Sequence, residues 1–241
     1  MNIELNPKLI FSKMLYFVLF LLLVNICGVV TKLYFGQDSF RMLVLLFDFD
    51  TEVNIPTLYS SFSLVIASFL LFIIASSHRR ADSIQYYWFG LAVIFLFLAV
   101  DEIASVHERI SAPVRDILDT SGFLYYAWVI PYGIALTIFV AIYFKFLVRL
   151  PKNIMFLFVI SGAMFVTGSI GFELLGGRHA EMYGENNFMF CLLYTCEELL
   201  EMLGIVIFIH ALLLYIASEL KLLTITIYED PPKKLESKRR P

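Results

Sequence analysis

The chain has 241 residues, of which 60% are hydrophobic and 16% are charged, and its mean hydropathy is +0.81. This apolar share is far above that of an ordinary soluble domain and excludes one. The composition instead predicts an integral membrane protein, whose first partner is the lipid bilayer.

Six stretches are long and apolar enough to cross a membrane. A helical span needs about 20 mostly apolar residues to cover roughly 30 Å of hydrocarbon. The stretches that qualify are residues 14–33, 58–77, 84–103, 124–144, 154–173 and 198–217. Lipid-exposed backbone must satisfy its own hydrogen bonds, so each stretch is predicted to be a helix. The expected fold is an all-α, polytopic membrane helical bundle. It has a single transmembrane domain over residues 1–228 and a short, basic, disordered tail over 229–241.

The first span follows two lysines and superficially looks like a secretory signal peptide. Its apolar core is too long for a signal peptide, no small-residue cleavage site follows it, and further spans come after it. We therefore expect the first span to be retained.

Basic residues predict the orientation. With both termini on one side, that side carries 13 of the 18 lysines and arginines and only 6 of the 21 acidic residues. Basic loops stay in the cytoplasm, so both termini are predicted to be cytoplasmic, in a cytoplasmic (inner) membrane. The outer face then carries 15 acids and 5 basic residues, a charge balance that attracts cations.

The predicted orientation can be tested with a thiol label. A cysteine at position 237, in the basic tail, should be shielded in intact cells from a reagent that cannot cross the membrane. Permeabilised cells provide the control, since the same cysteine should then be labelled. Ready labelling of intact cells would reverse the topology.

The first outer loop contains alternating acids, Asp48-Phe49-Asp50-Thr51-Glu52. The spacing resembles the start of a calcium-binding loop, but the glycine that such a loop needs for its turn is missing. A solvated acidic loop is therefore the favoured interpretation. The apolar segment before it, Met42 to Phe47, is too short to span and is expected at the membrane interface or beneath the bundle.

The third span runs directly into Asp101-Glu102-Ile103-Ala104-Ser105-Val106-His107-Glu108-Arg109, with no glycine or proline between. If the helix continues, Asp101, Ser105 and Glu108 share one face. Pro113 predicts that this helix ends before it. Acidic groups at the ends of spans are costly to keep and are functional-site candidates by default.

Two other spans carry helix-modifying residues. Pro131-Tyr132-Gly133 in the fourth span predicts a kink. In the fifth span, Ala163, Thr167 and Gly171 recur every four residues, a stripe that favours close helix packing.

The sixth apolar run, from Phe188 to Ala217, is longer than a membrane requires and is interrupted by three glutamates. Its first part, Phe188 to Cys196, must pack on protein, for which the segment Met42 to Phe47 is a candidate. Counting 20 residues from the cytoplasmic ends of spans three, five and six reaches Ile103, Glu173 and Glu198, so the acidic groups are predicted to lie at one level. The candidate site residues are Asp101, Glu102, His107, Glu108, Glu173, Glu197, Glu198 and Glu201.

Carboxylates this close together cannot all stay ionised without positive charge nearby. A purely structural network, neutralised by Arg109 and Arg178, is one alternative. The other is a bound divalent metal ion, since ligands rich in carboxylate with a single imidazole suit calcium, magnesium, manganese, iron or zinc. The paired Glu-x-x-His pattern of di-iron bundles is absent, as is His-Glu-x-x-His. His210, alone in the inner half of span six, is expected to be structural.

Four segments together, FDFDTEVNIPTLYSS, LAVDEIASVHER, GFE and CEELLEMLG, resemble uncharacterised bacterial multipass membrane proteins over about residues 45–217. The resemblance implies six helices and no particular activity.

The leading functional hypothesis is an outer-facing carboxylate cluster that binds a cation, with Asp101, Glu108, Glu173, Glu197 and Glu201 as core ligands, for transport, sensing or metal-dependent chemistry. One alternative is a membrane-embedded hydrolase that uses Glu197, Glu198 and His107 on lipid or peptide. Another is a non-catalytic accessory subunit, for which a membrane-protein partner or a homo-oligomer is expected. No nucleic-acid partner is expected. An open cavity favours chemistry, a continuous polar path favours transport, and a closed arginine-paired network favours the subunit.

Overall fold

The computed structural model describes residues 6–34, 44–78 and 83–220, and six of its helical stretches are long and apolar enough to cross a membrane. These stretches are α1 (Pro7–Tyr34), α3 (Ile55–Ser77), α4 (Ser83–Ala104), α6 (Val129–Leu147), the run of α7 (Lys152–Val166), η2 (Thr167–Phe172) and α8 (Glu173–Tyr183), and the run of α9 (Phe188–Tyr215) and η3 (Ile216–Leu220). The predicted all-α bundle with six spans is confirmed. The tail 229–241 lies outside the described residues.

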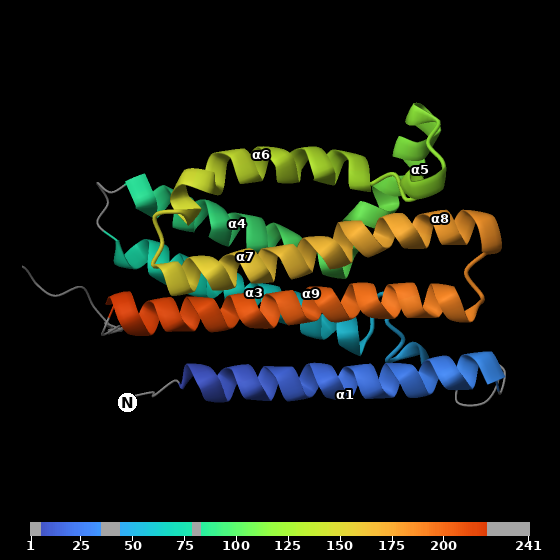
Figure 1. Ribbon diagram of the computed structural model, residues 1–241, viewed down its shortest axis with the longest axis horizontal. Coiled ribbons are helices and arrows are strands. Elements are labelled where there is room, and N and C mark those ends of the chain that lie inside the picture. The colour runs from blue at the N-terminus through green and yellow to red at the C-terminus, as the bar shows by residue number, and fades with distance from the viewer. Residues whose placement is uncertain (1–5, 35–43, 79–82, 221–241) are drawn as a thin grey trace, which may run out of the picture.

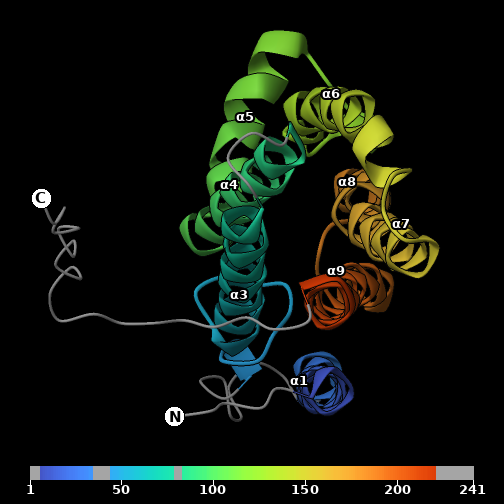
Figure 2. The same cartoon turned by 90° about the vertical axis from the view of Figure 1, so that its left-hand side faces the viewer.

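The six spans run along one axis, and the short helix α5 (Val106–Leu118) lies at the end where α8 meets α9 (Figure 1). Helix α9 is the centre of the bundle, since it packs against α1, α3 and α7. Seen along the bundle in Figure 2, α3 and α4 form one side, α6 and α7 the other, and α1 lies outermost beside α9.

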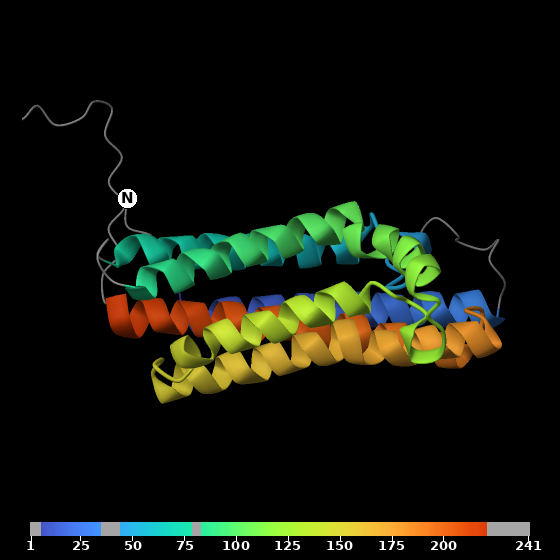
Figure 3. The ribbon, with the colours of Figure 1, turned by 90° about the horizontal axis from the view of Figure 1, so that it is seen from above.

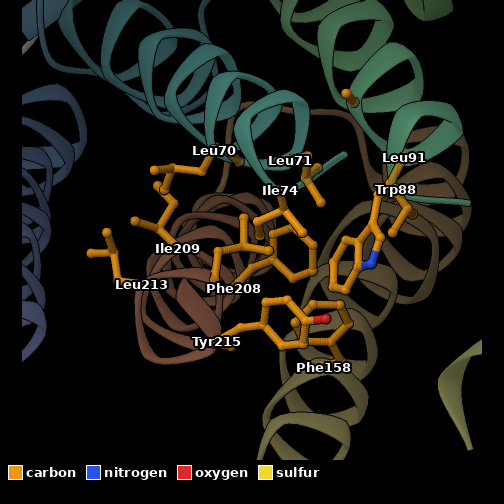
Figure 4. Close-up of a cluster of buried hydrophobic side chains, with 14 of the residues drawn as sticks. Leu70, Leu71, Ile74, Trp88, Leu91, Phe158, Phe208, Ile209, Leu213 and Tyr215 are labelled. Carbon is orange, nitrogen blue, oxygen red and sulfur yellow. The ribbon is translucent and has the colours of Figure 1, made fainter. Parts of the chain in front are cut away.

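The larger of two hydrophobic core clusters fills the half of the bundle away from α5. Trp88 is fully buried between α3, α4 and α9, and its ring lies 4.8 Å from that of Tyr215 and 4.9 Å from that of Phe146, measured between centroids. Figure 4 shows Trp88 facing Phe158 and Tyr215, with leucines and isoleucines of α3 and α9 beside them. Aromatic rings supply large contact areas, so this packing holds α4, α6, α7 and α9 together at the end of the bundle away from α5.

Helices α7 and α9 touch through their backbones. A side-chain carbon on Gly168 would lie 2.7 Å from the carbonyl oxygen of Glu197, and one on Gly204 would lie 2.9 Å from that of Ser161. The predicted stripe of Ala163, Thr167 and Gly171 does not form this contact, because Ala163 and Thr167 are exposed. Only glycine permits the contact actually made, so the small residues that matter are Gly168 and Gly204.

The segment Thr167–Phe172 is a π-helical turn, which the sequence did not predict. Hydrogen bonds from residue i to i+5 widen such a turn, so residues five apart come onto the same face. Glu173 therefore lies on the side of Gly168, which faces α9. The π turn points this carboxylate into the bundle.

The helix that carries Asp101 stops at Ser105, whose backbone is left-handed with φ 48°. Helix α5 then starts in a new direction and continues through Pro113. Two expectations were therefore wrong: the helix does not continue to Glu108, and Pro113 does not end one. The missing N–H of Pro113 is tolerated in this short surface helix, and the break at Ser105 lets α5 fold over the end of the bundle.

Helix α6 starts at Val129, so Pro131 lies in its first turn, where the N–H has no partner within the helix to lose. The predicted kink inside a longer span was therefore wrong. The buried residues of α6 are Val129 and Phe146, one near each end. In between, half-buried side chains make the contacts, among them Tyr143, whose hydroxyl donates to the carbonyl of Tyr87 at 3.2 Å. Figure 3 shows α6 running over α7.

The segment before α3, residues 44–54, is folded into the bundle. The Asn54 side chain caps α3 by accepting from the Thr57 amide at 3.1 Å, and it donates to the carbonyl of Asp48 at 2.6 Å. Asn25 of α1 accepts from the amide of Phe49 and donates to Thr195 of α9, both at 3.0 Å. The Phe188 to Cys196 stretch does pack on protein, with Phe190, Cys191 and Tyr194 against α1, Phe47 and Phe49; Met42 and Leu43 lie outside the described residues.

Candidate functional site

One cavity of about 1070 Å³ opens inside the bundle beneath α5, and all eight predicted site residues line it. They come from four elements that are distant in sequence: α4, α5, the start of α8, and α9. The acids of three spans therefore line one cavity, and their common level at the membrane boundary stays a prediction. What the cluster binds is a separate question.

Asp101 holds the end of the cavity together. Its Oδ1 accepts from the His107 amide at 3.0 Å and from the Tyr132 hydroxyl at 3.0 Å, while Oδ2 lies 3.2 Å from His107 Nδ1. Asp101 is only 6% exposed, so these partners satisfy a carboxylate that water barely reaches. This residue links α4, α5 and α6, and its oxygens are already committed. It is less free to bind a metal than the sequence suggested.

Glu52, His107 and Glu108 come together at the rim of the cavity. Each offers one ligand atom, and these atoms all lie within 4.8 Å of one another. Glu52 is aligned by Ser105, whose hydroxyl donates to its Oε2, and its Oε1 lies 3.9 Å from His107 Nε2. Because Nδ1 of His107 faces Asp101, Nε2 is the nitrogen left for a ligand, as in many metal sites where a carboxylate orients the imidazole.

Two groups at this rim have shifted pKa values. Burial lowers the pKa of His107, but the hydrogen bond and charge of Asp101, then Glu52 and Glu108, outweigh burial, so the net shift is upward. Burial raises the pKa of Glu52 more than its bond to Ser105 lowers it. In the absence of a metal ion, the carboxylates around His107 therefore favour its protonated form.

The deeper wall of the cavity is formed by the remaining carboxylates. Glu173 accepts from the indole nitrogen of Trp128 at 2.6 Å and lies against Glu197 of α9. Glu198 is within electrostatic range of Glu52 and His107, and it is also close to Glu102 and Glu201. The deep wall and the rim are therefore one continuous cluster.

Little positive charge balances this cluster. Ten acidic side chains line the cavity, and its lining includes one arginine, Arg115. Arg115 donates to the carbonyl of Tyr125 and stacks on the ring of that residue. Arg178 stacks on Phe123, and Arg109 is exposed; within the described part of the chain, neither is ion-paired with a carboxylate. The closed arginine-paired network is not the arrangement observed.

Sequence reasoning missed Glu52, which belongs to the acidic loop that was interpreted as solvated. Asp48 of this loop is buried, and Lys32 of α1 lies 3.4 Å from Asp48 and 3.5 Å from Asp50. Burial raises the pKa of Asp50 to about 6, against the opposing charge of Lys32. Alternating acids before Asn54-Ile55-Pro56, a helix start, were the available signal that the loop is anchored at the top of α3.

His210 is structural, as expected. Its Nδ1 lies 3.2 Å from the carbonyl of Pro7, and its ring packs on Phe11, far along α9 from the glutamates. It provides a natural control for His107.

The fold and the site define a multipass membrane protein with a carboxylate-lined cavity at one end of the bundle. The chain matches the model of a domain of unknown function, DUF8692, over residues 14–216, and it belongs to this family. The expected resemblance to uncharacterised multipass proteins agrees with this match, which extends further toward the N-terminus than residue 45. No curated protein and no solved structure gave a match.

Proposed function

We propose that the protein binds a divalent cation at the rim of the cavity, through Glu52, His107 Nε2 and Glu108, and uses it for chemistry on a molecule held in the cavity. The observation that supports this most strongly is the convergence of these three ligand atoms within 4.8 Å, at the entrance of a 1070 Å³ cavity. Two carboxylates and one imidazole leave coordination positions open for water or a substrate.

The deeper glutamates complete the proposed site. Glu102 and Glu198 lie outside the group of three ligand atoms but are near enough to Glu52 to interact with its charge, so they can orient a water on the same ion. Glu197 and Glu201, with Glu173, are the next layer and are available as proton acceptors. Of the predicted core ligands, Asp101 becomes the residue that orients His107.

Chemistry is favoured over transport by the far end of the cavity. Below Glu201 the lining of α9 is Gly204, Ile205 and Phe208, and that of α6 is mainly Leu136, Phe139 and Val140. Among the described residues, this part of the lining offers an ion the hydroxyls of Ser161 and Tyr143 but no further carboxylate. The small number of basic residues around the carboxylates also supports cation binding over the accessory-subunit alternative. A purely structural network of carboxylates would need basic partners to neutralise it.

Metal-dependent hydrolysis is the reaction class that this site supports best. A metal ion lowers the pKa of bound water and polarises a carbonyl, and a nearby carboxylate takes the proton. The sequence suggested Glu197 and Glu198 as a hydrolase pair. Both lie on the deeper wall of the cavity, from which they can accept this proton. The outer position of the site is part of this proposal and is supported by the distribution of basic residues.

Elemental analysis tests the proposal. The purified wild type, loaded with Mn²⁺ or Zn²⁺ and desalted, should retain about one ion per chain. His107→Ala and Glu52→Gln should each reduce the retained metal at least tenfold, the usual scale for loss of a ligand or its partner. Retention should fall as the pH is lowered through the raised pKa of His107, because protons then compete for Nε2.

His210→Ala and Glu219→Gln are the matched controls, since both lie away from the cavity and should leave the retained metal unchanged. If the wild type retains no ion after loading with either metal, the proposed site is wrong. Equal retention by His107→Ala and His210→Ala would also exclude it.

A further inference from the structure

The same cavity has a second, apolar half that the proposed metal site does not use. Ten residues separate Glu198 from Phe208 on α9, a distance of about 15 Å at 1.5 Å per residue. This is about half of the roughly 30 Å hydrocarbon thickness of a bilayer, so it is the length of one leaflet's acyl chain. Aromatic and aliphatic side chains line this part on every side, from α4, α6, α7 and α9.

The apolar half opens sideways to the lipid between α6 and α7. Val140 and Phe144 of α6 line the cavity and are 53% and 60% exposed, respectively, and Val159 of α7 lines it and is 48% exposed. Gly162 and Ala163 of α7 are also exposed lining residues, and a side-chain carbon on Gly162 would meet nothing within 4 Å. Accessible lining residues on the apolar parts of two neighbouring membrane spans support an opening of the cavity toward the lipid at this place.

Charge selects the head group of what enters. Ten acidic side chains and one arginine line the cavity, so acidic groups far outnumber basic ones even with one divalent cation bound. Carboxylates packed this closely are stabilised in their ionised form by a cationic partner. An anionic head would be repelled, whereas an ammonium would be attracted to Glu197, Glu198 and Glu201. Trp128 and Tyr132 beside the cluster provide aromatic faces, which also favour a cation.

We propose that the cavity binds a long-chain amine, which enters from the bilayer between α6 and α7, places its chain against Phe158 and Phe208, and brings its ammonium head to the glutamates. This extends the proposed function by naming the substrate class, and it rests on that function only for what happens after binding. The ammonium head would then lie beside the proposed metal site, where Glu198 of the deeper wall is close to Glu52 of the rim.

Photolabelling tests the proposal. The probe is a twelve-carbon primary amine with a diazirine at the end of its chain, added to the protein in phosphatidylcholine vesicles. Phe158 and Phe208 line the cavity but are only 9% and 7% exposed, so a probe reaches them through the cavity and not from the lipid surface. We expect labels on these two residues, and at least fivefold less labelling by the matched twelve-carbon carboxylate.

A matched pair of variants tests the entrance. Ala163→Phe places a ring in the opening and should reduce labelling of Phe158 and Phe208 at least fivefold. Ala141→Phe makes the same change at an exposed position of α6 that does not line the cavity, and labelling should be unchanged. Equal labelling by amine and carboxylate would overturn the choice of head group. Equal effects of the two variants, or labels confined to lipid-facing residues, would overturn the site.

The experiment is run with EDTA and again with Mn²⁺, which separates the two proposals. Amine labelling in EDTA supports this inference whether or not a metal binds. Retained metal without labelling of the cavity overturns this inference alone, and labelling without retained metal overturns only the metal site.

Discussion

Replacing Asp101 by alanine should destabilise the folded protein by about 3–5 kcal/mol, the cost of leaving a buried charge without its partner. The substitution removes the acceptor for the His107 amide, the counter-charge of its imidazole and the partner of the Tyr132 hydroxyl. For a chain of this length, that loss corresponds to a fall in melting temperature of roughly 10 °C. Thermal unfolding in detergent, followed by circular dichroism, measures it.

Two milder variants show whether Asp101 acts through these bonds. Asp101→Asn keeps one acceptor oxygen and should cost less than the alanine variant. Tyr132→Phe removes one hydrogen bond and should cost about 1 kcal/mol. A loss below about 1 kcal/mol for Asp101→Ala would mean that α5 is held in place by other contacts.

Gly168→Ala should destabilise the protein by about 1–3 kcal/mol, the usual cost of overpacking, although alanine is the better helix former. The added carbon would lie 2.7 Å from the carbonyl of Glu197 and 3.2 Å from the amide nitrogen of Glu201. Backbone atoms cannot rotate out of the way, so α9 must shift. Because Glu197 and Glu201 lie at that contact, the deep wall of the cavity shifts with it.

Gly162→Ala is the matched control, because it is the same substitution on α7 with open space around it. It should be neutral or stabilise the helix by up to about 1 kcal/mol. Similar melting temperatures for the two variants would show that α7 and α9 do not touch as described.

The six spans were predictable, because a span depends on apolar length. Counting a constant rise per residue also pointed to acids of three spans that line one cavity. The point at which the third span ends, and the direction of the chain after it, were not predictable. Asp101 and His107 are six apart and would face different sides of a continuous helix. They meet because Ser105 adopts a left-handed backbone conformation, which serine seldom takes. No glycine stands at this position to indicate such a conformation from the sequence.

Two further features depended on contacts between distant segments. Glu52 belongs to the site because Asn54 and Asn25 fasten its loop to α3 and α1, and the acidic spacing alone favoured a solvated loop. Glu173 faces inward because of the π turn before it, and periodicity assumes a regular helix. The end of the bundle at which an acid lies was therefore easier to predict than the direction in which its side chain points.

The contrast between α6 and α7 determines how the cavity can change in size. Contact of the α7 and α9 backbones at Gly168 and Gly204 makes that wall incompressible. The fully buried residues of α6 are Val129 and Phe146, and its middle section contacts α4 through half-buried side chains such as Tyr143, so this section is the more adjustable wall. A bulkier guest would be accommodated by bowing this one helix outward while the carboxylates stay in register. The bundle can therefore adapt to acyl chains of different thickness by moving α6, while the contact between α7 and α9 keeps the carboxylates in place.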